Sequence, residues 1–360
     1  MSDLGLIDSC YVGDVRDGLR ALIAAGVRAQ TCVTSPPYWG LRDYGTAQWD
    51  GGDAACDHTT QRLPQPNSKQ ATSKGSARDN MAGRDCRLCG ARRIDRQIGL
   101  ESTPAEYVEQ MVEVFRLVRE VLADDGTLWL NLGDSYSAGS QTGGTNSLER
   151  GRRIDRMFDR GASCSGVAPK NLIGIPWRVA FALQADGWYL RSDIIWAKPN
   201  PMPESVTDRP TKAHEYLFLL AKSERYYYDA AAIAEASLDT SIERASRGGS
   251  FVNGRNDGAP YAMQHSPVAG PTRNRRTVWT IATEPYADAH FATFPTALVE
   301  PCILAGSRVG DVVLDPFMGS GTVAQVAQSL GRRWIGCELN PTYVELQKRR
   351  AAQRGLELSP

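Results

Sequence analysis

A short turn rich in hydrogen-bond acceptors follows an apolar stretch near the start of the chain. The stretch Gln30–Thr34 is expected to form a strand, and the turn is Ser35-Pro36-Pro37-Tyr38. The two prolines stiffen the turn and remove two backbone donors, so the carbonyls of Ser35 and Pro36 can accept hydrogen bonds from a bound molecule. Tyr38 adds an aromatic wall. Because parallel sheets place ligands at the carboxyl ends of their strands, the turn is a candidate site; an ordinary proline-rich turn is the alternative.

A second candidate loop lies near the end of the chain. It is the segment Asp315–Thr322 (DPFMGSGT), between a strand expected over Val312–Leu314 and a helix expected over Gly321–Leu330. Its glycines let the backbone approach a ligand closely. A further strand, Arg333–Cys337, leads to Glu338, where a carboxylate can bind ribose hydroxyls. The loop matches neither G-x-G-x-x-G nor G-x-x-x-x-G-K-[ST], which disfavours nicotinamide dinucleotides and nucleoside triphosphates as ligands.

Four metal-type ligands stand apart from the remaining, scattered cysteines. Cys56 and His58 form one pair, and Cys86 and Cys89 form a second pair with C-x-x-C spacing. Three cysteines and one histidine make a closed structural zinc set, and a metal would stabilise a polar segment that has little apolar material. Two accidental pairs are the alternative. The arginines around the second pair, which could meet phosphates, are Arg84, Arg87, Arg92, Arg93 and Arg96.

The elements that must position these residues alternate between strands and helices. Apolar runs predict further strands over Thr127–Leu132, Trp188–Trp196 and Glu215–Leu220. Apolar residues at spacings of three and four predict a helix over Pro104–Leu122 with Thr103 as its N-cap, and another helix is expected over Pro341–Ala352. This alternation predicts an α/β fold with a largely parallel sheet.

Composition excludes several classes of protein. Of the 360 residues 42% are apolar, and Lys+Arg and Asp+Glu are both 41, so the net charge is zero. A uniformly basic nucleic-acid coat is therefore excluded. We expect no membrane segment, because no apolar run approaches the ~18 residues that a span needs, and no signal peptide. Scattered cysteines fit a reducing compartment, so the expected location is the cytoplasm.

Three polar segments, 46–96, 137–170 and 235–276, interrupt the alternation and are long enough to suggest function. From Arg150 to Lys170 there are six basic residues and two acidic ones. Such clusters are expected to bind phosphates, although solvated surface charge is the alternative for any single arginine. The candidate phosphate-binding residues are Arg150, Arg152, Arg153, Arg273, Arg275 and Arg276.

Together the two loops resemble the motifs of the DNA amino-methyltransferases, which act on exocyclic nitrogens. Ser35–Tyr38 is similar to their catalytic motif and Asp315–Thr322 to their S-adenosylmethionine motif, in the permuted order of the β group. Other segments that resemble the family are Gly13-Asp14, Gly126–Asp134, Asp193–Pro203 and His290–Leu304, the last with its Phe294-Pro295.

The resemblance implies a Rossmann-like S-adenosylmethionine-dependent methyltransferase fold: a seven-stranded, mostly parallel sheet with helices on both faces. It implies that a flipped base stacks on Tyr38 while Ser35 and the Pro36 carbonyl accept the amino hydrogens. The expected catalytic residues are Ser35, Pro36, Pro37 and Tyr38, and the expected cofactor-binding residues are Asp14, Phe294, Pro295, Asp315, Pro316, Phe317, Gly319, Ser320, Gly321, Thr322 and Glu338. Trp39 fits stacking and core packing equally well.

The same resemblance suggests which DNA base is methylated and how the chain divides into domains. Ser35 at the head of the motif is more typical of cytosine-N4 enzymes, so cytosine is favoured and adenine-N6 is the alternative. The division places a catalytic domain at 1–45, 97–200 and 277–360, with its basic loop at 137–170. A zinc-binding insert is expected at 46–96 and a target-recognition region at 201–276.

The expected partner is double-stranded DNA in the cytoplasm of a bacterial or phage-infected cell, at the nucleoid. The sequence leaves open whether the protein forms a homodimer. It also leaves open whether the enzyme has a cognate restriction endonuclease or is an orphan. Competing functions are a non-catalytic zinc-containing DNA-binding protein, a nicotinamide oxidoreductase and an amino-methyltransferase for RNA or protein amides. Carbon-5 cytosine methylation would need a nucleophilic cysteine after proline; Pro301-Cys302 has that order but is expected to be buried and structural.

Overall fold

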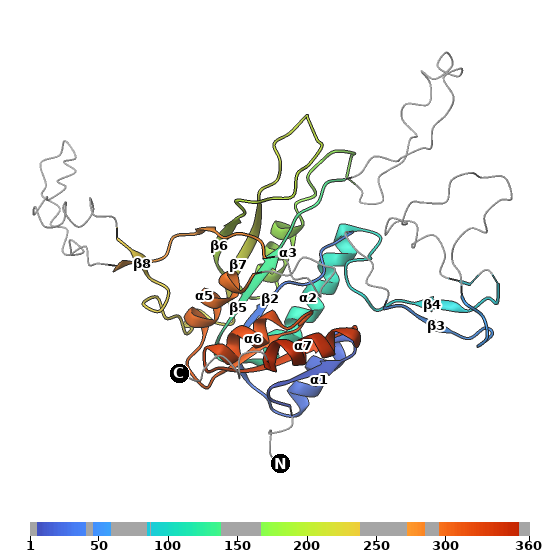
Figure 1. Cartoon of the computed structure of the whole chain (residues 1–360), viewed down its shortest axis with the longest axis horizontal. Helices are drawn as coiled ribbons and strands as arrows, with labels where there is room; N and C mark the ends of the chain where they lie inside the picture. Colours follow the sequence, from blue (N-terminus) through green and yellow to red (C-terminus); the bar gives the residue numbers. More distant parts are fainter. Residues whose placement is uncertain are drawn as a thin grey trace, which may run out of the picture.

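The molecule is built around one large β-sheet (Figure 1). The computed structural model describes residues 6–40, 46–58, 85–86, 88–137, 167–237, 272–284 and 295–352. In this part of the chain eight strands form the sheet, in the order β1-β12-β11-β2-β5-β7-β6-β10. They are β1 (Ser9–Val12), β2 (Ala29–Thr34), β5 (Leu122–Leu132), β6 (Tyr189–Ala197), β7 (His214–Ala221), β10 (Val278–Thr280), β11 (Val312–Asp315) and β12 (Arg333–Glu338).

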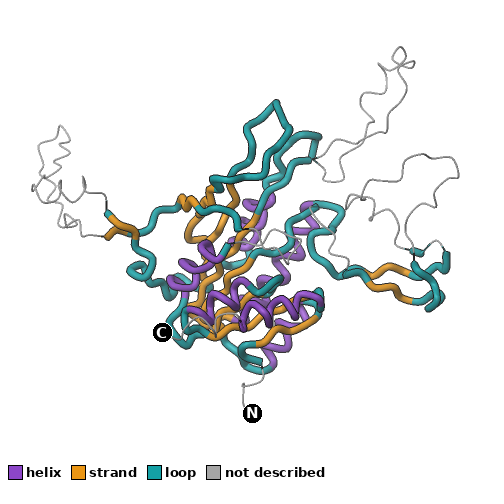
Figure 2. The backbone as a smooth tube through the Cα atoms, in the orientation of Figure 1, coloured by secondary structure: helices purple, strands orange, loops and turns teal. Residues whose placement is uncertain are grey.

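The sheet is mostly parallel. Strand β7 runs antiparallel to both β5 and β6, and the other neighbouring pairs are parallel. The mostly parallel α/β sheet expected from the sequence is therefore confirmed, with one strand more than the expected seven. The additional pairs β3 (Gln48–Asp50) with β4 (Arg92–Ile94) and β8 (Glu235–Ala236) with β9 (Thr272–Arg273) lie apart from the central sheet (Figure 2).

Helices cover both faces of the sheet. They are α1 (Val15–Ala24), α2 (Pro104–Val121), α3 (Ile175–Ala185), α5 (Thr296–Gly306), α6 (Thr322–Ser329) and α7 (Thr342–Ala352). The first three pack into one buried apolar cluster and α5 and α6 into the other, while α7 packs beside α6. Side chains of the central strands alternate between the two clusters: in β2, Cys32 joins the first and Val33 the second. None of the helices in the described part of the chain is both long and apolar enough to cross a membrane.

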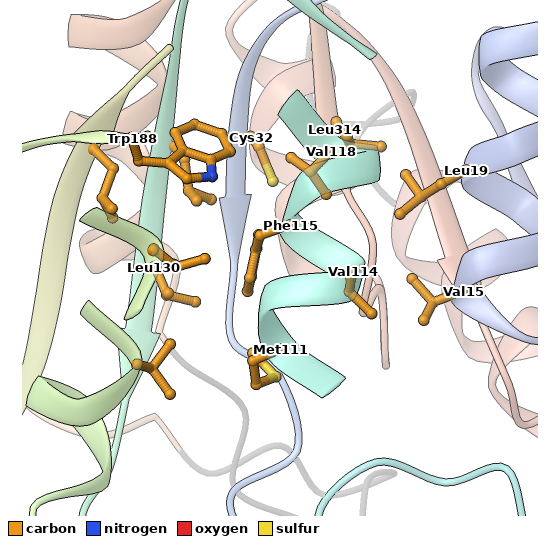
Figure 3. Close-up of a cluster of buried hydrophobic side chains, with 14 of the residues drawn as sticks. Val15, Leu19, Cys32, Met111, Val114, Phe115, Val118, Leu130, Trp188 and Leu314 are labelled. Atoms are coloured by element: carbon orange, nitrogen blue, oxygen red, sulfur yellow. The ribbon is translucent and has the colours of Figure 1, made fainter. Parts of the chain in front are cut away.

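Helix α2 shows how the sequence forms these layers. Thr103 Oγ1 accepts a hydrogen bond from Glu106 N at 3.2 Å, and Pro104 occupies the first turn, where its missing N–H costs nothing. Met111, Phe115 and Val118 recur on one face and are fully buried against the sheet (Figure 3). Burial of each such side chain contributes about 1.5–3 kcal/mol, which fixes this face of the helix against the strands.

The expected elements match the observed ones closely, and the missed elements lie mostly at the margins. The six expected strands appear as β2, β5, β6, β7, β11 and β12, and the three expected helices as α2, α6 and α7. Helix α5 falls largely within His290–Leu304, the segment that resembles a helix of the family, whereas the edge strands β1 and β10 and the helices α1 and α3 are additions. Strand β7 belongs to the central sheet although it falls within 201–276, the range that stays a prediction as a target-recognition region.

Candidate active site

The two candidate loops leave the sheet side by side. Strands β2 and β11 are parallel neighbours with Cys32 opposite Leu314, so Thr34 and Asp315 end together at one edge. Thr34 Oγ1 donates to Asp315 Oδ1 at 2.6 Å, which ties the two strand ends together. The two loops therefore begin at the same place, although Thr34 and Asp315 are 281 residues apart in the sequence.

A cavity of about 1040 Å³, open to solvent, lies between these loops. Of the expected site residues, those that line it are Asp14, Ser35, Pro37, Pro316, Phe317, Gly319, Ser320, Thr322 and Glu338. Pro36, Tyr38, Pro295, Asp315 and Gly321 are described but do not line it. Phe294, the other half of the expected Phe-Pro pair, lies outside the described residues. The cavity thus joins the start of the Ser35 turn to the glycine-rich loop.

The glycine-rich loop is shaped around a half-buried carboxylate, that of Glu338. Gly319 and Gly321 adopt positive φ values of 51° and 87°, which glycine tolerates best. Gly319 N donates to Glu338 Oε2 at 2.8 Å, and Asn340 N donates to Glu338 Oε1 at 2.7 Å. Burial raises the pKa of Glu338, although these two N–H groups favour its charged form. Each carboxylate oxygen keeps a second lone pair for a ligand hydroxyl.

Helix α7 supports the loop from behind, a role that the sequence reasoning missed. Arg350 is buried, and its Nη1 donates to Ser320 Oγ at 2.7 Å and Thr322 Oγ1 at 2.6 Å. Gln347 Nε2 donates to the Gly319 carbonyl at 2.8 Å. The loop backbone and hydroxyls are therefore held before any ligand arrives.

Asp14 lies where β1 passes into α1. Its Oδ1 accepts from Arg16 N and Arg16 Nε, both at 2.9 Å, so it caps the helix and forms an ion pair. Burial alone would raise the pKa of Asp14, but the hydrogen bonds and charge of Arg16 outweigh it and lower that pKa. Asp14 therefore presents a fixed negative charge at the cavity wall.

The Ser35 turn is held by a polar network from three other segments. Ser35 Oγ donates to Asn131 Oδ1 at 3.1 Å and also lies 3.3 Å from the Tyr38 hydroxyl. The Tyr38 hydroxyl lies 2.7 Å from Glu215 Oε2 and 2.9 Å from Asn131 Oδ1. With a single hydrogen, it donates best to the charged acceptor, Glu215. Lys198 Nζ pairs with the other oxygen of Glu215 at 2.5 Å.

Tyr38 itself is locked in position. A Cβ atom on Gly133 would lie 2.5 Å from Tyr38 Cε2, so the ring rests directly on that glycine. Burial, together with the charge of Glu215, raises the pKa of Tyr38, which keeps the phenol protonated. The Pro37 carbonyl accepts from the Tyr107 hydroxyl of α2 at 2.9 Å, which anchors the turn. Trp39 is buried and donates to the Glu101 carbonyl at 3.0 Å, so it is a structural residue.

Sequence reasoning did not assign Asn131, Glu215 or Lys198 to the site. The signal available was a polar residue inside or beside an apolar strand: Asn131 interrupts β5, Glu215 lies near the start of β7, and Lys198 follows β6. Strands buried on their faces rarely carry such residues unless they are hydrogen-bonded. Only the sheet pairing shows that the three meet at one turn.

Cys302 has no place in this site. It lies in α5, is 1% exposed, and donates from Sγ to the Leu298 carbonyl. Burial raises the pKa of its thiol, which disfavours the thiolate that carbon-5 methylation needs. Because Cys302 does not line the cavity, the structural interpretation agrees with its geometry.

The expected metal ligands come together. The ligand atoms of Cys56, His58, Cys86 and Cys89 all lie within 4.8 Å of one another, at the end of the β3–β4 hairpin. The two pairs are therefore neighbours in the fold, and zinc binding by them stays a prediction.

The expected phosphate-binding arginines are only partly described. Arg150, Arg152 and Arg153 lie outside the described residues. Arg273 Nε and Arg276 Nε both contact Glu235 Oε1, at 2.9 Å and 2.6 Å. The guanidinium of Arg275 lies 4.5 Å from the centre of the Trp279 ring. Glu235 would compete with a phosphate for Arg273 and Arg276, and DNA contact by these residues stays a prediction.

Comparison with known proteins agrees with this geometry. A family model described as DNA methylase, N6_N4_Mtase, matches residues 29–349. The Type II methyltransferase M.Cfr9I of Citrobacter freundii is 43% identical over 336 residues, which are 93% of this chain and 85% of that protein. M.SmaI of Serratia marcescens is 42% identical over 344 residues, which are 95% of this chain and 90% of that protein.

Among solved structures, the PvuII DNA methyltransferase (cytosine-N4-specific) is similar with a TM-score of 0.52 and 17% identity, over 95% of this chain and 85% of that one. At this identity the likeness shows a shared fold. The resemblance inferred from the two loops is confirmed by the family match and by the Type II relatives. This chain belongs to the N6_N4_Mtase family of DNA methylases.

Proposed function

We propose that the protein transfers a methyl group from S-adenosylmethionine to the N4 amino group of a cytosine flipped out of double-stranded DNA at a specific site. The observation that carries the proposal is the single cavity that joins Ser35 to the glycine-rich loop and Glu338. A donor held by the loop and a base held by the turn would then meet within one cavity, as a direct transfer requires.

The cavity fits a nucleoside-type cofactor. Glu338 can accept from ribose hydroxyls with the lone pairs that Gly319 N and Asn340 N leave unused. Thr46 Oγ1 is buried at the cavity wall without a hydrogen-bond partner among the described residues, so a ligand group can satisfy it. Bound there, S-adenosylmethionine would supply an activated methyl group on a sulfonium.

The chain's own residues would prepare the amino group. Its lone pair is delocalised into the ring, and acceptors for its hydrogens favour a tetrahedral, nucleophilic nitrogen. Ser35 Oγ and the Pro36 carbonyl would take this role, and the fixing of the turn by Asn131 and Tyr107 supports it. As Ser35 Oγ takes a proton from the amino group, it would pass its own hydrogen to the Tyr38 hydroxyl, which would pass its hydrogen to Glu215 Oε2.

Cytosine is favoured over adenine because a serine hydroxyl both donates and accepts, which suits the edge of cytosine. Adenine-N6 methylation is the alternative, and the family includes both.

The second cofactor of the proposal is a structural zinc ion at Cys56, His58, Cys86 and Cys89. DNA is proposed to meet the basic segments, including Arg273 and Arg276.

A transfer assay with labelled S-adenosylmethionine and plasmid DNA tests the function. We expect transfer by the wild type, none by Tyr38→Ala, and wild-type transfer by Cys302→Ser. The Cys302→Ser control separates loss of the base platform from a general effect of substitution. Full activity of Tyr38→Ala, or no activity of the wild type on any DNA, would contradict the proposal.

A further inference from the structure

The four ligand atoms at the end of the β3–β4 hairpin have the dimensions of a zinc site. In a regular tetrahedron with Zn–S of about 2.3 Å and Zn–N of about 2.0 Å, two sulfurs lie about 3.8 Å apart and a sulfur lies about 3.5 Å from a nitrogen. Cys56 Sγ lies 3.7 Å from Cys86 Sγ, and Cys89 Sγ lies 3.3 Å from His58 Nδ1. The cysteines are not disulfide-bonded, since a bond would bring the sulfurs to about 2.05 Å.

The local backbone is built to bring these atoms together. Gly90 adopts a φ of +74°, and its N–H donates to the Cys86 carbonyl at 2.8 Å, which closes the turn between the two cysteines. A Cβ atom on Gly52 would lie 2.7 Å from Cys89 Sγ, so only glycine fits opposite that ligand. The Trp49 ring stacks on His58 with centroids 5.1 Å apart, which orients the imidazole.

The hairpin lacks an apolar core that could hold it without a metal. Its described residues, 46–58, 85–86 and 88–96, contribute no side chain to either of the two buried apolar clusters. Strands β3 and β4 have three residues each, and among the described residues their pairing with each other is extended only by an isolated bridge between Asp85 and Arg92. An isolated two-stranded hairpin of this size is marginal in water. Metal ligation would supply the missing stabilisation.

The other end of the hairpin forms part of the cavity wall. Strand β3 begins two residues after Thr46, and β4 ends two residues before Arg96. Thr46, Arg96, Gln97 and Ile98 all line the cavity. Gln97 and Ile98 are 8% and 4% exposed, whereas Thr46 is half-buried and Arg96 is exposed. The pairing of Gln48 with Ile94 links the wall to the cluster of ligands through the hairpin.

We propose that Cys56, His58, Cys86 and Cys89 bind one zinc ion, and that this ion fixes the β3–β4 hairpin and thereby the wall formed by Thr46 and Arg96–Ile98. Three thiolates and an imidazole favour zinc over hard cations such as magnesium. The metal is structural, because four protein ligands leave no open coordination position for catalysis. Its effect on the cofactor is indirect, through the order of the wall.

Metal content of the full chain tests the site, with a matched pair of substitutions at one position. Both His58→Ala and His58→Cys remove the stacking on Trp49, but only His58→Cys restores a fourth ligand. After dialysis against a chelator, we expect one zinc per chain in the wild type and in His58→Cys, and loss of zinc from His58→Ala. If His58→Ala fails to fold while His58→Cys folds, that result also supports the metal site. A wild type without zinc, or equal zinc in both variants, overturns the site.

Hydrogen exchange tests the link to the wall. Removal of zinc should speed the exchange of residues 92–98 by about tenfold or more, while β12 (Arg333–Glu338) keeps its rate. Equal exchange of 92–98 with and without zinc overturns the link even when zinc binds. Calorimetry with S-adenosylhomocysteine, a readout that rests on the proposed function, should show binding about tenfold weaker without zinc. A zinc-bound protein that never binds this ligand contradicts the proposed function, whereas zinc content and exchange still decide the metal site.

Discussion

Replacement of Gly133 by alanine tests the position of the Tyr38 ring. A Cβ atom at Gly133 would lie 2.5 Å from Tyr38 Cε2 and 2.8 Å from Cδ2. Carbon atoms in contact normally lie about 3.5 Å apart, so the ring would have to move by about 1 Å. Gly133 directly follows the central strand β5, which leaves the backbone little freedom to yield, and the ring must take up most of the shift.

A shift of this size should act on the transfer rate. Misplacement of a reacting group by about 1 Å costs roughly a hundredfold in rate. We therefore expect kcat of Gly133→Ala to fall by about that factor, while affinity for S-adenosylhomocysteine stays at the wild-type value, because Gly133 does not line the cavity. Overpacking should also lower the free energy of unfolding by about 1–3 kcal/mol.

Gly126→Ala provides a matched control on the same strand. Its Cβ atom would lie 2.9 Å from the Ala123 carbonyl and 3.1 Å from the Gln30 carbonyl, away from Tyr38. This variant should lose stability but keep kcat. Steady-state transfer with labelled cofactor, together with urea unfolding, separates the two effects. Equal kcat values for Gly133→Ala and Gly126→Ala would refute a role for the ring position.

Three further predictions concern charged groups. Glu215→Gln removes the charged acceptor of the Tyr38 hydroxyl and the partner of Lys198; kcat should fall at least about tenfold with unchanged cofactor affinity, as steady-state kinetics and calorimetry would show. Burial raises the pKa of Asp315 from 3.8 to about 7. Folding therefore favours the protonated form of Asp315, so this group lowers the free energy of unfolding as the pH rises from 3.8 to about 7. Urea unfolding of Asp315→Asn at several pH values should lack this decrease. Arg276→Gln should reduce the slope of log affinity for DNA against log salt by about 0.9, as titrations at several salt concentrations would show; an unchanged slope would remove Arg276 from the phosphate contacts.

The central elements could be predicted because their burial leaves a strong pattern in their own residues. The expected strand Gln30–Thr34 appears as Ala29–Thr34, and the expected helix Pro104–Leu122 as Pro104–Val121. The edge strands β1 and β10 could not be predicted in this way. They have four and three residues, Tyr11 and Val278 are exposed, and their strand structure depends on pairing with β12 and β6.

The same holds for the site: its parts that are adjacent in sequence could be predicted, and the parts that meet only in the folded chain could not. The Ser35 turn and the glycine-rich loop could be recognised from residues that are adjacent in sequence. The network around Tyr38 could not, because Asn131, Glu215 and Lys198 come from three separate strand segments that meet only through the sheet order. The support of the loop by Arg350 likewise depends on how α7 packs, which its own sequence does not specify.

Nucleoside analysis of modified DNA tests the central claim most directly. Plasmid DNA incubated with the purified protein and S-adenosylmethionine is digested to nucleosides and separated by mass spectrometry. The cavity that joins Ser35 to the glycine-rich loop predicts N4-methylcytosine, absent from DNA treated with Tyr38→Ala. N6-methyladenine in its place would contradict the choice of base, and DNA without any methylated amino group would contradict the account as a whole.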